Sequence, residues 1–353
     1  MNSAAEAPTF SSTATASAIS FEHLTQLSDL RGLFEHADHL VPRFEHGYCT
    51  DDNARLLVVT GRADDTGAAR TLSRLALAFL LDAQASDGLF HNRMDISGSW
   101  TDSPTNEDWW GRGVWALGAS SVEHRDPAVR QWARAAFDRS VDVRSPWPHA
   151  MAFAALGAAP VLVDDPTHTG AASLLRHALT TIGNPPAGAW RWPLPRLTYA
   201  NAAIAEAVIA AGVALASQEA IDRGLAMLEW LVGIQNRDGQ LSVIGTDGLR
   251  STDPTPRDGK PMFDQQPIEV AAIADACWCA FQVTGDSRWA QGVAMANAWF
   301  DGVNDCGFVM FDEASGGGYD GLHADRVNLN EGAESTLAFI STRQRGSLLA
   351  APE

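Results

Sequence analysis

The sequence predicts an all-α fold, an (α/α)6 barrel in which six inner helices are enclosed by outer ones. Segments with apolar residues at helical spacing recur along the 353 residues, whereas alternating β-branched runs are nearly absent. The helical segments also alternate between two kinds, one apolar almost all round and one with a narrower apolar stripe. All-apolar helices must be covered by others, so this alternation, at intervals of about 40–70 residues, indicates helical hairpins closed into a ring.

The first half of the chain shows three inner and two outer segments. "TDDNARLLVVTG" from 50 begins with acids and then continues as apolar sequence, and "AARTLSRLALAFLLDAQ" at 68–84 carries more charge on one face. "NEDWWGRGVWALGAS" from 106 and "PAVRQWARAAFDRSV" at 127–141 repeat this pair. "PHAMAFAALGAA" from 148 is again apolar on every side, which predicts a third inner helix.

The second half continues the pattern to the end of the ring. "ANAAIAEAVIAAGVALA" from 200, "DQQPIEVAAIADACWCAFQVTG" from 264 and "EGAESTLAFIST" from 331 are the remaining inner segments. Residues 219–235 and 286–302 have the composition of outer helices. The sixth inner helix is expected to close against the first. Because the inner helices of such a ring run parallel, we expect their N-terminal ends to meet at one mouth of the barrel.

Composition limits the partners and the location. The formal net charge of −18 at pH 7 means that nucleic acid and anionic membrane surfaces would repel the chain. Residues 1–20 are small and polar, which predicts a disordered tail and no signal peptide. No later run is long and apolar enough to enter a bilayer. We therefore expect a cytoplasmic protein with one barrel domain at 21–345 and a C-terminal tail at 346–353.

The sequence predicts neither a metal nor a cofactor. The chain has four cysteines, Cys49, Cys277, Cys279 and Cys306. They fit reduced thiols, because Cys277 and Cys279 have neither redox nor zinc-finger spacing. His36, His39 and His46 lie close together in the sequence but lack the glutamate-centred helix motif of zinc hydrolases.

Polar residues gather where the inner segments begin, and the ring brings these starts together. Single motifs of this kind also serve as helix N-caps and acidic first turns, but capping does not require paired acids followed by Asn or Trp at helix after helix. Carboxamides beside carboxylates suit vicinal hydroxyl groups. The residues expected to bind substrate at this mouth are Tyr48, Asp51, Asn53, Arg55, Trp109, Trp110, Arg112, His149, Trp192, Tyr199, Asn201, Gln265, Gln266, Glu269, Tyr319, Asp320, Asn328 and Asn330.

Aromatic residues in the same stretches favour a carbohydrate ligand. The only three tyrosines of the chain, and five of its 12 tryptophans, fall in the predicted mouth loops. Aromatic rings stack on the apolar faces of pyranose rings, while carboxylates and amides bind the hydroxyl groups around them. The alternative interpretation is that these tryptophans fill the barrel, since Trp is usually mostly buried.

The ordered series "HGYCTDDNAR", "EDWWGRGVWALG", "LTYANA", "FDQQPIEVAAIADA", "YDGL" and "VNLNEGAESTLA" resembles a bacterial family within the six-hairpin glycosidase superfamily. The resemblance covers about residues 28–340. It implies an (α/α)6 toroid, a role in glycan metabolism and a functional link to group 1 glycosyltransferases, to which related domains are fused or beside which they are encoded. Such relatives often carry Phe-Glu after the second Trp of the fourth motif, where this chain reads Trp192-Pro193-Leu194-Pro195.

Glycoside hydrolysis requires one protonated carboxyl and one ionised carboxylate in unlike environments. We expect Glu334 to act as general acid, because the preceding Gly-Ala allows close approach of substrate, and Asp52 as general base for water. The superfamily resemblance implies an inverting mechanism with the two groups on different inner helices. The reserve acids are Asp51, Glu107, Asp108, Asp264, Glu269 and Asp320, with Asp264 the strongest. Arg55 and Arg112 have an alternative, structural role as partners of these acids.

Three other classes stay open at the sequence level. A sugar epimerase or isomerase of the same fold would need a histidine pair, for which His149 and His323 are the candidates. A non-catalytic glycan-binding or regulatory partner of a glycosyltransferase would keep the aromatics without needing an acid and base. A zinc-dependent cyclase or prenyltransferase toroid would need a Cys/His/Asp ligand set, for which only Cys49 near His46 qualifies.

Overall fold

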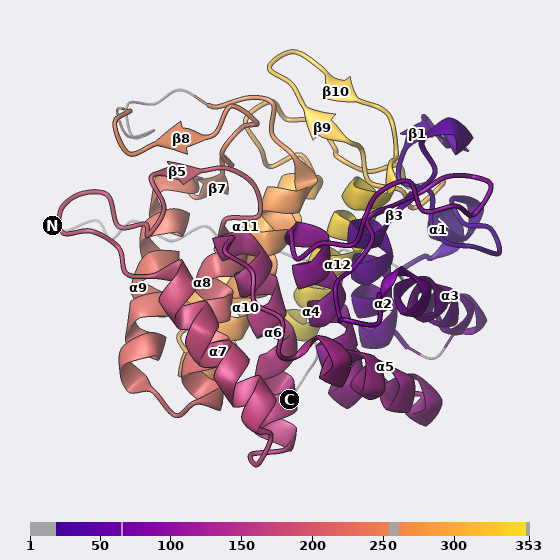
Figure 1. Ribbon diagram of the computed structural model, residues 1–353. Helices are drawn as coiled ribbons and strands as arrows, with labels where there is room; N and C mark the ends of the chain where they lie inside the picture. The colour runs from indigo at the N-terminus through magenta and orange to yellow at the C-terminus, as the bar shows by residue number, and fades with distance from the viewer. Residues whose placement is uncertain (1–18, 65, 254–260, 351–353) are drawn as a thin grey trace, which may run out of the picture.

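Six inner helices form a closed ring in the computed structural model, which describes residues 19–64, 66–253 and 261–350. Each inner helix packs against the next, and α12 packs against both α10 and α2, so the ring closes as the sequence predicts. Figure 1 shows this ring with α12 (yellow) beside α2 (indigo). The inner helices are α2 (Thr50–Arg62), α4 (Asp108–Glu123), α6 (Pro148–Asp164), α8 (Ala202–Ala214), α10 (Pro267–Thr284) and α12 (Ala333–Ala350).

The outer layer follows the predicted alternation. Each outer helix packs on the inner helix that precedes it in the chain. The sequence singled out four of these segments, and α7 is an additional one. The outer helices are α3 (Gly67–Ala83), α5 (Pro127–Ser140), α7 (Thr169–Ile182), α9 (Gln218–Gln235) and α11 (Ser287–Phe300), with a short α1 (Glu22–Gln26) before the ring.

Small residues allow the inner helices to approach closely. A Cβ atom built on Gly118 of α4 would lie 2.3 Å from the backbone oxygen of Gly157 of α6, and one on Gly111 would lie 2.3 Å from that of Ala150. The α6 helix is buried along nearly its whole length. Alanine and glycine therefore fill the centre of the barrel, where larger side chains would push the helices apart.

The connections at the N-terminal ends of the inner helices contain short antiparallel ladders, most of which Figure 1 shows on one side of the ring. These two-residue strands tie the loops that carry the polar motifs to one another. The pairs are β1 (Ala37–Asp38) with β2 (Val41–Pro42), β3 (Tyr48–Cys49) with β4 (Arg93–Met94), β5 (Arg196–Leu197) with β8 (Leu249–Arg250), β6 (Asn236–Arg237) with β7 (Gln240–Leu241), and β9 (Gly321–Leu322) with β10 (Val327–Asn328). A 3-10 turn, η1 (Phe44–His46), precedes β3.

The described part of the chain begins at Ile19 and ends at Ala350. The tail expected at 1–20 falls outside the described residues except for its last two. The last helix continues to Ala350, beyond the domain end expected at residue 345. Among the described residues, none of the helices has the length and apolar character that crossing a membrane requires.

Candidate active site

The first turns of three inner helices place acids and arginines together at the barrel mouth. On α2, Asp52 and Arg55 are three residues apart, and on α4, Asp108 and Arg112 are four apart, so each pair shares a helix face. Glu334 lies in the first turn of α12, next to α2 in the ring. The predicted convergence of distant acidic motifs is therefore present in the structure.

Arg55 links the two carboxyls that the sequence analysis placed in the reaction. Its Nη1 lies 2.5 Å from Oδ1 of Asp52, and its Nη2 lies 2.7 Å from Oε2 of Glu334. The two carboxyls differ in exposure: Asp52 is only 2% exposed, whereas the side chain of Glu334 is 42% exposed. Burial raises the pKa of Asp52 to about 6, although Arg55 opposes the shift.

A second cluster of charged residues is centred on Arg112 of α4, which packs on α2 as α12 does. Its Nη1 lies 2.6 Å from Oδ1 of Asp51 and 3.8 Å from Oδ2 of Asp108. The Tyr199 hydroxyl donates a hydrogen bond to Asp108. Burial raises the pKa of Asp108, with Arg112 opposing it, so this partly accessible carboxyl holds a proton more readily than an ordinary aspartate.

Tyr199 and His149 form the aromatic wall beside Arg112. Their rings stack at 4.7 Å between centroids, and Nε2 of His149 lies 3.0 Å from the backbone oxygen of Tyr199. The Arg112 guanidinium lies 4.5 Å from the centre of the Phe153 ring. Burial and the neighbouring Arg112 lower the pKa of His149 to about 4, so this imidazole is neutral at pH 7.

Asp264 and His323 form a separate pair in the loops above α10. Nδ1 of His323, next to β9, contacts Oδ1 of Asp264 in a hydrogen bond. Asp264 is half exposed and His323 less so. A carboxylate beside an imidazole orients the ring, an arrangement that is common for acid–base histidines.

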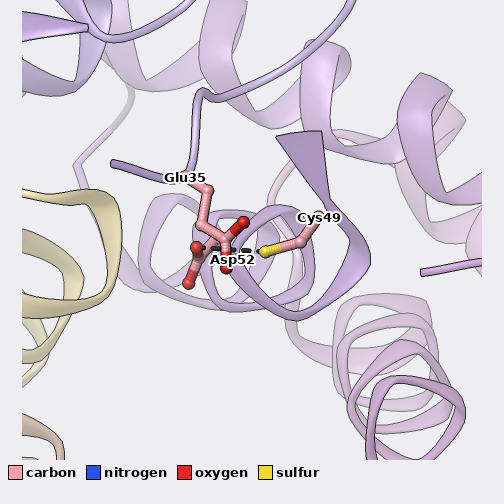
Figure 2. Close-up of side chains that lie close together, drawn as sticks. All are labelled: Glu35, Cys49 and Asp52. Carbon is pink, nitrogen blue, oxygen red and sulfur yellow. Dashed lines mark hydrogen bonds between the residues drawn. The ribbon is translucent and has the colours of Figure 1, made fainter. Parts of the chain in front are cut away.

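Glu35, Cys49 and Asp52 meet below the mouth, as Figure 2 shows. The Cys49 thiol donates a hydrogen bond to Oδ2 of Asp52 at 3.1 Å, and burial holds the pKa of this thiol well above its ordinary value. Both carboxylates already have a cationic partner, because Arg55 pairs with Asp52 and Arg93 pairs with Glu35. The charges of this cluster are therefore balanced by arginine, and the thiol stays protonated.

Comparison with solved structures defines the fold to which this geometry belongs. A sugar epimerase from a ruminal bacterium is similar over 93% of this chain and 95% of that one, with a TM-score of 0.66 and 13% identity. A cellobiose 2-epimerase from Bacillus thermoamylovorans matches over 90% and 95%, with a TM-score of 0.64 and 12% identity. An inactive variant of an α-1,6-mannanase from a Salegentibacter species, in complex with α-1,6-mannotriose, matches over 93% and 96%, with a TM-score of 0.62 and 10% identity.

The chain is a six-hairpin toroid. No protein-family model and no curated protein sequence matches it. The solved structures share the fold at 13% identity or less, so the roles of individual residues must be argued from this structure.

The toroid places several predicted site residues in its scaffold and not on the accessible mouth. Trp110 and Trp192 are completely buried. Tyr48 is also buried, and its hydroxyl donates to Asp29. Asn53 is buried too, and its amide group bonds to the backbone of Leu33. These two tryptophans, Trp110 and Trp192, therefore lie in the interior, as the alternative interpretation expected for tryptophans at the mouth.

Carboxamides predicted to bind hydroxyl groups instead hold loops of the toroid. Gln265 is buried and bonds through Nε2 to Asp305 at 2.6 Å. Asn328 accepts from the backbone N–H of Asn330, which in turn accepts from that of His39. Their side chains stabilise the connections, since each satisfies a backbone or buried partner.

Other predicted residues lie at intermediate depth around the mouth. Trp109 donates through Nε1 to the backbone oxygen of Phe90. Asp320 accepts from the N–H of Gly332 and from the Ser335 hydroxyl, and burial raises its pKa. Three more predicted residues are partly or fully exposed: Glu107 precedes α4, Gln266 precedes α10, and Tyr319 precedes β9. The last two, Asn201 and Glu269, are buried and bond to each other.

The segment Trp192-Pro193-Leu194-Pro195, where similar sequences often carry Phe-Glu, lies in the wall of the toroid. Trp190 donates through Nε1 to the backbone oxygen of Leu194 at 2.8 Å, and Trp192 stacks on Trp230 of α9.

Two open depressions of the surface, one near Pro185 and Met227 and the other near Phe21 and Thr66, contain none of the predicted site residues. The arginine side chains occupy the space between the acids at the mouth.

Sequence reasoning missed three contributors to the site. Glu35 lies outside the inner segments, and Phe153 looked like an ordinary core residue of α6. Trp147 is one of the five tryptophans in the predicted mouth loops, but no role in binding was predicted for it. It precedes α6 and is 54% exposed. A tryptophan two residues before a polar His149 at an inner helix start was the available signal for the last of these.

Proposed function

We propose that this protein is a carbohydrate-active enzyme, a glycoside hydrolase that uses two carboxyl groups at the mouth of the toroid. The observation that carries the proposal is the convergence of Asp51, Asp108 and Glu334 from three inner helices, each partly accessible and each beside an arginine. A pair of carboxyls in unlike environments is the requirement of this reaction.

The exposures of the acids change the roles that the sequence suggested. Asp52 is buried beneath Arg55 and has no access to a substrate, so we assign it to holding Arg55. Asp108 is the better general acid, because burial raises its pKa. Glu334, exposed and paired as a carboxylate with Arg55, takes the role of general base for water.

We propose that the reaction is inverting, with its two carboxyls on different inner helices. Both α4 and α12 pack on α2, so Asp108 and Glu334 lie on either side of the α2 first turn. Inverting enzymes keep their two carboxyls about 6.5–9.5 Å apart to admit a water molecule, which is wider than the spacing in retaining enzymes.

The mannanase supports a role for paired aspartates. Its description is that of an inactive variant in which two adjacent aspartates are replaced by asparagine. This chain has an adjacent pair, Asp51 and Asp52, at the start of an inner helix. We propose that the pair acts here by fixing Arg112 and Arg55, which in turn hold the reacting carboxyls.

A sugar epimerase is the second candidate, favoured by the contact between His323 and Asp264. Proton abstraction beside a carbonyl needs a base, and the imidazole of His323 is held in place by its hydrogen bond to Asp264. Several similar structures are described as epimerases, and one as a D-mannose isomerase. His149, neutral through burial, would be the second histidine.

Product analysis separates the two candidates. The purified protein is incubated with α-1,6-mannotriose, cellobiose and a panel of further oligosaccharides, and the products are resolved by anion-exchange chromatography and mass spectrometry. Hydrolysis releases shorter sugars, and we expect Asp108→Asn and Glu334→Gln to reduce it by about 10²–10⁴-fold. The control is Asp325→Asn, an exposed acid between β9 and β10.

Two outcomes overturn the hydrolase. One is unchanged turnover in both Asp108→Asn and Glu334→Gln. The other is conversion of a sugar into an isomer of equal mass that disappears in His323→Ala, which supports the epimerase. Binding of oligosaccharides without any conversion would instead favour a non-catalytic glycan-binding partner of a glycosyltransferase. That partnership and a cytoplasmic location stay predictions.

A further inference from the structure

Glu269 is a buried acid that the proposed reaction does not use. It lies in the first turn of α10 and is 2% exposed. Both of its carboxyl oxygens accept hydrogen bonds from Asn201: Oε2 accepts from the backbone N–H at 3.1 Å, and Oε1 accepts from Nδ2 at 2.9 Å. A buried carboxyl with this paired contact to one neighbouring loop fixes that loop in position.

The contacted loop is closed and conformationally demanding. Oδ1 of Asn201 accepts from the N–H of Thr198 at 2.9 Å, so one side chain ties Thr198, Asn201 and Glu269 together. Between them, Ala200 has a φ of 44°, in the left-handed region that costs a non-glycine residue energy. Such a conformation persists where its surroundings hold it, and Glu269 binds the residue that follows Ala200 in the chain.

This loop carries Tyr199 to the candidate general acid. The Tyr199 hydroxyl donates to Asp108, its ring stacks on His149, and the Arg112 guanidinium lies 5.7 Å from its ring centre. None of these groups is on α10. Glu269, which bonds to this loop, lies on α10, three positions from α4 in the ring of inner helices.

We propose that Glu269 is a positioning residue that, through Asn201, holds the Tyr199 hydroxyl on Asp108. Its meaning for catalysis rests on the proposed function, whereas its effect on Tyr199 does not. Loss of Glu269 leaves two donors of Asn201 without a buried acceptor, so the turn at Ala200 relaxes and the tyrosine leaves the carboxyl.

Fluorine NMR tests this directly, because the chain has only three tyrosines. Protein labelled with 3-fluorotyrosine gives three resonances, and Tyr199→Phe assigns that of Tyr199. Asp108→Asn is expected to shift the same resonance, which confirms the contact. In Glu269→Ala we expect the Tyr199 resonance to move to the position of a solvent-exposed tyrosine, while those of Tyr48 and Tyr319 stay unchanged.

Glu269→Gln is the conservative variant, which keeps the volume and one acceptor oxygen. It is expected to restore the Tyr199 resonance in part, and it decides the question if Glu269→Ala does not fold. Glu229→Gln, on the exposed face of α9, is the matched control and should change none of the three signals. A Tyr199 resonance at its wild-type position in every folded Glu269 variant overturns the proposal.

Activity measurements separate this proposal from the proposed function. If the enzyme hydrolyses glycans, Glu269→Ala is expected to lower kcat more than it raises KM, and Glu269→Gln to recover part of kcat. A moved Tyr199 resonance with no hydrolysis by the wild-type protein overturns the hydrolase and leaves the positioning role. If the wild-type protein hydrolyses glycans and the Tyr199 resonance does not move in the Glu269 variants, the positioning role is overturned and the hydrolase stands.

Discussion

Asp52 and Glu334, near opposite ends of the chain, contact the two terminal nitrogens of the same arginine, Arg55. This shared guanidinium joins the first inner helix to the last and closes the ring at its mouth. Arg55 is also the only cationic partner of the Asp52 carboxyl among the contacts of the described residues. The site and the stability of the toroid therefore depend on one buried side chain.

Arg55→Met is expected to destabilise the protein by about 3–5 kcal/mol at pH 8, because Asp52 would be left as an unpaired buried charge. The Asp52 pKa, about 6 in the folded protein, would rise further, so at pH 5 the carboxyl is neutral and the loss is smaller. Urea unfolding at both pH values measures it. Arg74→Met, which breaks an exposed pair, should change little, and an equal loss at pH 5 and pH 8 would exclude Asp52 as the cause.

Trp147→Ala is expected to raise KM for an oligosaccharide by about tenfold with little change in kcat, since a stacked sugar contributes about 1–1.5 kcal/mol. Trp147 is 54% exposed at the start of α6. Trp132→Ala is the matched control, because Trp132 is 61% exposed on the outer helix α5. Equal KM values for the two variants would remove Trp147 from the binding site.

Glu206→Gln is expected to stabilise the protein at alkaline pH. Burial and the neighbouring Asp275 raise the pKa of Glu206 to about 8, so the folded state binds this proton more tightly than the unfolded chain does. The resulting stabilisation is complete below about pH 4.5 and is lost as the pH rises through 8. Denaturation at pH 5 and pH 9 should show a variant that is about 2–4 kcal/mol more stable at pH 9 only, and parallel curves would contradict this assignment.

Gly118→Ala is expected to destabilise the toroid by about 1–3 kcal/mol, because the new methyl group would meet the α6 backbone and force α4 and α6 apart. Gly233→Ala provides the opposite case. It lies on the exposed side of α9 with open space around it, so alanine should stabilise the helix by about 0.5–1 kcal/mol. Thermal unfolding compares the two, and similar melting temperatures would show that the α4–α6 contact is adaptable.

The predicted alternation survived because it rests on local patterns. The inner segments that open with "TDDNAR" and "NEDWWG" became α2 and α4, with starts within two residues of those expected. The mouth followed from helix direction alone. By contrast, Tyr48 and Trp192 could not be separated from Trp147 by sequence, because an aromatic residue in a loop has the same pattern whether the loop folds inward or outward.

The sequence by itself determined the helical alternation, the ring and the gathering of acids at one mouth, since apolar periodicity and helix polarity are properties of each segment. Only the tertiary structure decided which acids are buried in the scaffold and which are accessible at the mouth. That choice depends on burial and on charges that lie far away in the chain: Asp52 is covered while Glu334 is open, and Tyr199 reaches Asp108 through a loop held by Glu269. A carboxyl's environment is set by the side chains around it in space, and no stretch of sequence contains them.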